Sequence, residues 1–138
     1  MDFINKVFCD DCLNVMKDIP NESIDLIVTD PPYLINYKTG HRKKNYTKPL
    51  DGSIIKQHDF TTEIQNDNDF ELIPNYIKEC YRIMKNDTAM YMFCNDVHVD
   101  FFKQELNNVG FKIINMIVWV KNNHTAGDLT HAFGKKYE

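Results

Sequence analysis

The run IDLIVTDPPYLINY, residues 24–37, changes character in its middle. Residues 24–29 are mostly apolar, which is typical of a strand in a parallel sheet whose two faces are both covered by helices. An acid, two prolines and an aromatic residue follow at once, as Asp30, Pro31, Pro32 and Tyr33. Ligands of such sheets bind outside the carboxyl ends of the strands. The run therefore predicts a buried strand over 24–29 with a binding site at its end.

The four residues after this strand suit a planar ring that carries an amino group. Asp30 can accept hydrogen bonds from an exocyclic amine, and Tyr33 offers a flat face on which a base stacks, worth roughly 1–3 kcal/mol. Pro31 and Pro32 stiffen the turn, because each ring fixes φ near about −65°, and their carbonyls still accept hydrogen bonds. The alternative is a structural turn in which Asp30 caps an amide and Tyr33 packs on the core. The whole tetrapeptide after a strand favours the binding site.

Strand and helix patterns alternate along the remaining chain. Further strands are predicted over 3–9, 88–94 and 111–121, with Trp119 in the core, and helices over 11–17, 70–84 and 97–108. Asn95 and Asp96 are expected to cap the last helix and Gly110 to end it. Residues 34–66 show no sustained period, which predicts a substrate-facing loop. This alternation indicates a single α/β domain over 1–138 with helices on both faces of its sheet.

Composition and charge narrow the function classes. The four cysteines show no disulfide rhythm, and the five histidines suggest no catalytic triad. Cys9 and Cys12 have CxxC spacing, but no second pair or paired histidines complete a zinc site, so no metal is expected. The chain has no membrane-length apolar stretch or signal peptide, and we expect it in the cytoplasm, away from membranes. A net charge of −4 argues against coating nucleic acid by bulk attraction. Residues 34–50 nevertheless contain no acid and five basic side chains, Lys38, Arg42, Lys43, Lys44 and Lys48. This segment either contacts DNA phosphates or is a solvated loop.

The tetrapeptide and its surroundings resemble a known family. Asp30 to Tyr33 match the (D/N/S)PP(Y/F/W) motif of the DNA methyltransferases that methylate N6 of adenine or N4 of cytosine with S-adenosylmethionine. The approach CDDCLNVMKDIPNESIDLIVTDPPY and the later GFKIINMIVWVKNN and FGKKYE resemble the class in which the catalytic motif precedes the cofactor motif. The resemblance implies a partial, three-layer Rossmann-like sheet, with Asp11 and Asp30 near the cofactor.

The same resemblance implies a mechanism and a substrate. The target adenine would be flipped out of the DNA duplex. Asp30 and the Pro31 carbonyl would accept its N6 protons while the methyl group moves directly in line, with Tyr33 stacked on the base. Lys121 and Asn122 match the family pattern beside the base pocket. The Asp form of the motif favours adenine N6. The alternatives are a non-catalytic nucleic-acid-binding or assembly subunit of this fold, and a methyltransferase for cytosine N4 or RNA.

One family feature has no counterpart in the sequence. The family's glycine-rich cofactor loop typically reads FxGxG, whereas none of the five glycines here is paired as GxG. We therefore expect the catalytic amino-terminal portion of such an enzyme, without the strands that carry this loop. Unpaired strand edges invite pairing with another chain. A complementary chain or a homodimer partner is accordingly expected to complete the sheet.

Overall fold

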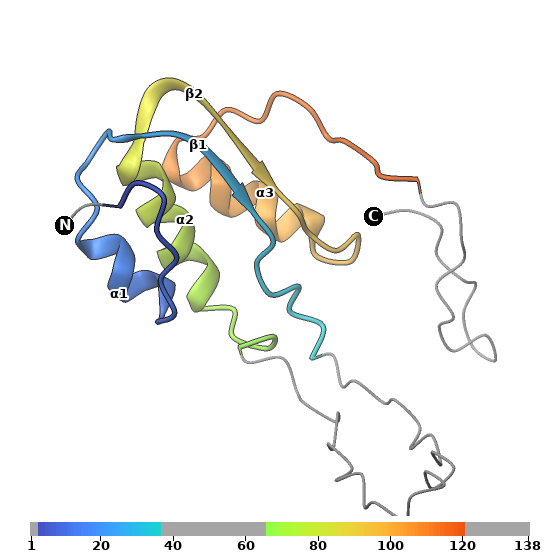
Figure 1. Cartoon of the computed structure of the whole chain (residues 1–138). Helices are drawn as coiled ribbons and strands as arrows, with labels where there is room; N and C mark the ends of the chain where they lie inside the picture. The colour runs from blue at the N-terminus through green and yellow to red at the C-terminus, as the bar shows by residue number, and fades with distance from the viewer. Residues whose placement is uncertain (1–2, 37–65, 121–138) are drawn as a thin grey trace, which may run out of the picture.

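The computed structural model describes residues 3–36 and 66–120, which form three helices and two strands (Figure 1). In chain order these are α1 (Cys12–Lys17), β1 (Ile24–Thr29), α2 (Leu72–Ile83), β2 (Met84–Met92) and α3 (Val99–Val109). β1 and β2 pair in parallel, with Thr29 opposite Met92. The prediction of an α/β fold is confirmed. None of the helices in these two ranges is long and apolar enough to span a membrane.

The strand that precedes the tetrapeptide has the predicted bounds, 24–29. Its inward side chains pack with those of β2 against the helices, in two clusters of buried residues. One cluster is built on Met16, Cys80 and Ile83. The other consists of Leu34, Ile73, Ile77 and Phe102. Because the strands are parallel, their carboxyl ends lie at one edge of the sheet, and this edge carries the tetrapeptide.

Helix α2 connects the two clusters. Its buried residues recur every three or four positions, so that one apolar stripe faces the sheet: Ile73, Ile77, Cys80 and Ile83. Pro74 lies in the first turn, where the missing N–H would have no partner within the helix. The predicted bounds, 70–84, differ from the observed ones by two residues at the start and one at the end. The helix predicted from this periodicity is therefore confirmed.

The ends of α1 and α3 agree only in part with the capping residues expected from the sequence. α1 begins after Asp11, whose carboxylate accepts a hydrogen bond from the Leu13 amide at 2.8 Å. α3 ends at Gly110, as predicted, with a left-handed φ of 114°. The predicted cap of α3 was wrong, because the Asn95 carboxamide accepts from the Val97 amide instead, at 2.7 Å, in the turn before the helix. His98 occupies the N-cap position and makes no side-chain capping bond.

Three expectations about strands are not met. The structure has no strand over 3–9 or over 111–119, and β2 begins at residue 84, not 88. Residues 111–120 run apart from the sheet, as the orange segment of Figure 1, and Trp119 is 57% exposed, so its predicted core position was wrong. An apolar alternating pattern becomes a strand only where a neighbouring strand pairs with it, and the described residues supply none here.

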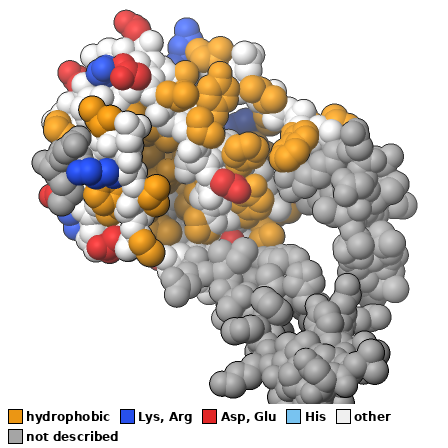
Figure 2. All heavy atoms as spheres, in the orientation of Figure 1, with side chains coloured by type: hydrophobic (Ala, Val, Ile, Leu, Met, Phe, Trp, Pro, Cys, Tyr) orange, Lys and Arg blue, Asp and Glu red, His pale blue; other side chains and the backbone are white. Residues whose placement is uncertain are grey.

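The two strands also bury only one of their faces within the described residues. Ile27 and Met90 point toward the helices, whereas Leu26, Val28 and Tyr91 are more than half exposed. Figure 2 shows hydrophobic side chains gathered over the region of the strands. The expectation that β1 is covered on both faces is therefore not met by residues 3–36 and 66–120.

Candidate active site

The tetrapeptide leaves β1 at the carboxyl edge of the sheet. The Phe93 amide donates to the Thr29 carbonyl at 2.9 Å, one step beyond the last paired residue of β2. This bond fixes the direction of the chain immediately before Asp30. Asp30 is exposed, while Pro31 is buried. The carboxylate is thus presented to solvent from an anchored turn, as a group that contacts a substrate must be.

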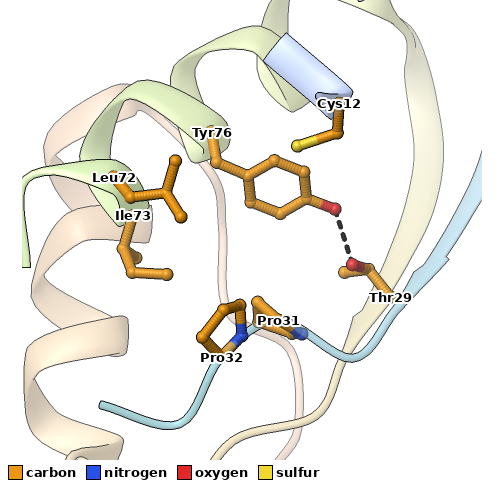
Figure 3. A pocket seen from close by; sticks show the side chains of 7 residues that line it. All are labelled: Cys12, Thr29, Pro31, Pro32, Leu72, Ile73 and Tyr76. Carbon is orange, nitrogen blue, oxygen red and sulfur yellow. Dashed lines mark hydrogen bonds between the residues drawn. The ribbon is translucent and has the colours of Figure 1, made fainter. Parts of the chain in front are cut away.

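A pocket of about 160 Å³ lies beside this turn (Figure 3). It is bounded by Pro31 and Pro32 on one side and by the start of α2 on the other, with the first residue of α1 at its edge. Its lining is almost entirely apolar and consists of Cys12, Thr29, Pro31, Pro32, Leu72, Ile73 and Tyr76. A pocket of this size and polarity suits a flat ring or an aliphatic group.

The two hydroxyl groups that line the pocket form a hydrogen bond with each other. The Tyr76 hydroxyl and the Thr29 hydroxyl are 2.6 Å apart, so α2 is joined to the last residue of β1. Burial, with a smaller contribution from the neighbouring Cys80, raises the pKa of Tyr76 well above its ordinary value. Burial likewise raises the pKa of the Cys80 thiol to about 11. Both groups are therefore neutral at physiological pH, and the pocket wall carries no charge from either.

The turn that follows the tetrapeptide is held from a distant part of the chain. Leu34 is buried and has a left-handed φ of 61°. Its amide donates to the Asp67 carboxylate at 2.9 Å, and the Asn36 amide donates to the Asp67 carbonyl at 3.0 Å. Asp67 and Tyr76 were both missed by the sequence analysis. Neither stands in a motif, and only the tertiary structure brings them to the tetrapeptide.

Asp11 lies next to the pocket through its neighbour Cys12. It is exposed, and one of its carboxylate oxygens, Oδ1, caps α1. A carboxylate has two oxygens and about four acceptor sites, so Asp11 keeps acceptor capacity beyond the cap. The structure thus brings the start of α1 and the tetrapeptide to one pocket. The predicted basic residues of 38–48, together with Lys121 and Asn122, lie outside the described residues.

Metal ligands do not gather in the part of the chain that the structure describes. No three His, Cys, Asp or Glu side chains of residues 3–36 and 66–120 come close enough to hold an ion. All four cysteines are free thiols, of which Cys80 is buried.

The fold is similar to that of a solved methyltransferase structure. The M1.HpyAVI–SAM complex superposes with a TM-score of 0.57 at 21% identity, over 96% of this chain and 49% of that one. This likeness confirms the predicted partial Rossmann-like fold.

Sequence comparison places the chain among DNA methyltransferases. Type II methyltransferase M.HinfI of Haemophilus influenzae is 31% identical over 122 residues, which are 88% of this chain and 33% of that protein. DNA adenine methyltransferase YhdJ of Escherichia coli (strain K12) is 30% identical over 128 residues, 93% of this chain and 37% of YhdJ. The chain spans about a third of the length of these curated relatives. The family model N6_N4_Mtase, described as DNA methylase, matches residues 24–138. The chain therefore belongs to the N6_N4_Mtase family of DNA methylases.

Proposed function

We propose that this chain carries the methyl-transfer site of a DNA methyltransferase that acts on N6 of adenine with S-adenosylmethionine as donor. The observation that carries the proposal is Asp30, an exposed carboxylate on a rigid double-proline turn beside an apolar pocket. Membership of the N6_N4_Mtase family supports the reaction class. The preference for adenine is supported by the Asp form of the motif and by the similarity to an adenine methyltransferase.

The pocket fits one ring of the proposed donor. Ligand sites for drug-sized molecules usually measure roughly 300–1,000 Å³. At about 160 Å³ the pocket is smaller than this range, so it suits a single planar ring. We assign it to the adenine of S-adenosylmethionine, with the exocyclic amine directed at the free acceptor sites of Asp11. When bound, S-adenosylmethionine supplies an electrophilic methyl group on a sulfonium sulfur.

Asp30 and Pro31 would hold the amino group of a flipped target base. The Asp30 carboxylate and the Pro31 carbonyl are both acceptors, and proline has no N–H to compete with them. Accepting hydrogen bonds from both N6–H groups would draw electron density toward the nitrogen and direct its lone pair at the methyl carbon. Tyr33 would hold the ring by stacking. The catalysis is thus positioning and electrostatics, with no covalent enzyme intermediate.

The test is methyl transfer from radiolabelled S-adenosylmethionine to DNA by the Asp30→Ala variant. We expect transfer to fall to background while the thermal midpoint is unchanged, since Asp30 is exposed. Asp25→Ala is the matched control, because Asp25 lies in the strand before Asp30 and its side chain forms an exposed ion pair with Lys85. Turnover by the Asp30→Ala variant would show that Asp30 does not have the proposed role.

Nucleoside analysis of the product separates the alternatives. N6-methyladenine supports the proposal, whereas N4-methylcytosine or methylated RNA supports a related enzyme with a different substrate. A folded wild-type chain that binds DNA but not S-adenosylmethionine would indicate either the non-catalytic subunit or a cofactor site that needs the strands of the glycine-rich loop.

A second proposal concerns the exposed face of the sheet. Leu26, Val28 and Tyr91 present a contiguous apolar surface on neighbouring strands, and apolar patches of this kind mark interaction sites. The curated relatives are about three times as long as the region they share with this chain. We propose that polypeptide equivalent to the unshared part of these relatives covers this face in the methylating enzyme.

A further inference from the structure

Asp67 is a buried carboxylate that the proposed reaction does not use. It is 3% exposed, whereas Asp30 at the other side of the same turn is open to solvent. A buried charge is costly unless hydrogen bonds compensate for its lost hydration. Here the carboxylate accepts the Leu34 amide at 2.9 Å, in a buried hydrogen bond between residues 33 positions apart. The bond holds the residue that directly follows the tetrapeptide.

The backbone that Asp67 holds is in an uncommon conformation. Leu34 and Asn36 have φ angles of 61° and 50°, in the left-handed region that bulky residues such as leucine rarely adopt. Such a conformation persists only where several contacts impose it. Leu34 has two of them: its side chain is buried beside Ile73, Ile77 and Phe102, and its amide is bound by Asp67. The Asp67 carbonyl adds a third restraint by accepting the Asn36 amide.

Fixing the Leu34 amide also fixes the residue before it. The N–H of Leu34 and the carbonyl of Tyr33 belong to one planar peptide unit. The Tyr33 Cα lies in this plane, so holding the plane restrains ψ of Tyr33 and limits the directions in which the Tyr33 side chain leaves the backbone. A stacking ring is useful only in one orientation relative to its base. A restraint on this peptide unit is therefore a restraint on base binding.

We propose that Asp67 is a positioning residue that acts through the Leu34 amide to orient Tyr33 against the target base. The inference rests on the proposed function, in which Tyr33 stacks on the flipped adenine. It adds a role for a residue that lies outside the catalytic motif and after the segment 37–65 in the chain. In this proposal Tyr33 touches the base, and Asp67 acts through its hydrogen bond to the backbone that follows Tyr33.

Three variants test the role. Asp67→Ala removes the acceptor, and Asp67→Asn keeps a neutral acceptor that forms a hydrogen bond of about half the strength. Asp69→Ala is the matched control, because the Asp69 carboxylate accepts the amides of Glu71 and Leu72 at the start of α2 and does not touch Leu34. Tyr33→Ala gives the reference for complete loss of stacking.

The first measurement is amide hydrogen exchange, which requires no activity. We expect exchange at Leu34 to accelerate more than tenfold in Asp67→Ala, by a few-fold in Asp67→Asn, and not at all in Asp69→Ala. The second is fluorescence quenching of a single-stranded oligonucleotide that contains 2-aminopurine. Asp67→Ala should weaken binding of this probe about fivefold or more, approaching Tyr33→Ala, since base stacking on an aromatic residue accounts for an affinity change of this order.

The outcomes separate this inference from the proposed function. A wild-type chain that does not quench the probe overturns the stacking role of Tyr33, and the inference with it. Normal quenching by the wild type and by folded Asp67→Ala overturns the inference alone. If Asp67→Ala does not fold, Asp67→Asn decides. Unchanged exchange at Leu34 and unchanged quenching in that variant overturn the inference, and intermediate values of both support it.

Discussion

Two carboxylates at the two ends of the tetrapeptide lie in opposite environments. Asp30 is exposed and can serve a ligand, whereas Asp67 is buried and is committed to the Leu34 amide. Asp11 resembles both of them: one carboxylate oxygen accepts the capping hydrogen bond of α1, and the side chain is exposed and can also bind a ligand. The environment of each carboxylate, and not its residue type, decides which of them is available for chemistry.

Substitution of Asp11 by asparagine separates its two roles. Asparagine caps helices about as well as aspartate, so the thermal midpoint should not change. The loss of the charge should weaken binding of S-adenosylmethionine about tenfold, since a hydrogen bond to a charged group contributes about 1.5–3 kcal/mol. Calorimetric titration measures this directly. Equal affinity in the Asp11→Asn variant would remove Asp11 from the cofactor site.

The sequence predicted some of these residues and not others, for a physical reason. Asp30, Pro31, Pro32 and Tyr33 are contiguous and follow a strand, so their local order already indicates a binding turn. Asp67 looks like any acid in an irregular segment, because its partner is 33 positions away. Tyr76 has the spacing of a core residue in an amphipathic helix, and only the packing of α2 on β1 brings its hydroxyl to Thr29.

At the scale of elements, one arginine joins α1 to α2. The Arg82 guanidinium donates to the Met16 carbonyl at 2.7 Å and to the Ile19 carbonyl at 2.8 Å, at the end of α1. Two further bonds, from Nε and Nη2 of Arg82 to the Glu79 carboxylate, form a salt bridge and orient the planar group. The last carbonyls of a helix have no partner within it. The Met16 carbonyl also accepts the Ile19 amide at 3.0 Å. Arg82 adds a charged donor from the neighbouring helix and so ties the end of α1 to α2.

Replacing Arg82 tests this connection. Arg82→Ala should lower the free energy of unfolding by about 2 kcal/mol, because partly buried carbonyls lose charged donors. Arg82→Lys should recover only a small part of the loss, since a single ammonium cannot reproduce the planar fork. Lys85→Ala is the control and should cost about 0.5 kcal/mol or less, as its ion pair with Asp25 is exposed. Denaturant titration measures all three, and equal losses for Arg82→Ala and Lys85→Ala would exclude the proposed connection.

The elements themselves were predicted to different degrees. α2 and β1 were correct within two residues, because buried faces impose a period that is visible in the sequence. The strands predicted over 3–9 and 111–121 were not found in the described residues. A strand depends on hydrogen bonds to a neighbouring strand, and the sequence of one strand does not contain its partner. The apolar side chains of 112–120 are consequently exposed, whereas Phe111 still packs against the core.

At the scale of the whole molecule, the described residues have one buried and one open side. The helices cover the inward side chains of both strands, while the outward side chains remain exposed. Open strand faces and edges are sites where other polypeptides attach. If other polypeptide covers this face in the enzyme, the face is open when the chain is alone. We therefore expect the isolated chain to associate with itself through this surface.

A charge placed on this face should suppress the association without unfolding the chain. Val28 is 64% exposed, so Val28→Lys should change the free energy of unfolding by about 0.5 kcal/mol or less. In sedimentation velocity experiments over a range of concentrations, we expect the wild type to associate and the variant to be mainly monomeric. Asn86→Lys adds the same charge at an exposed polar residue near the start of β2 and should associate like the wild type. If both variants associate equally, the open face is not the contact surface; if Val28→Lys unfolds, that side chain is buried in solution and the face is already covered.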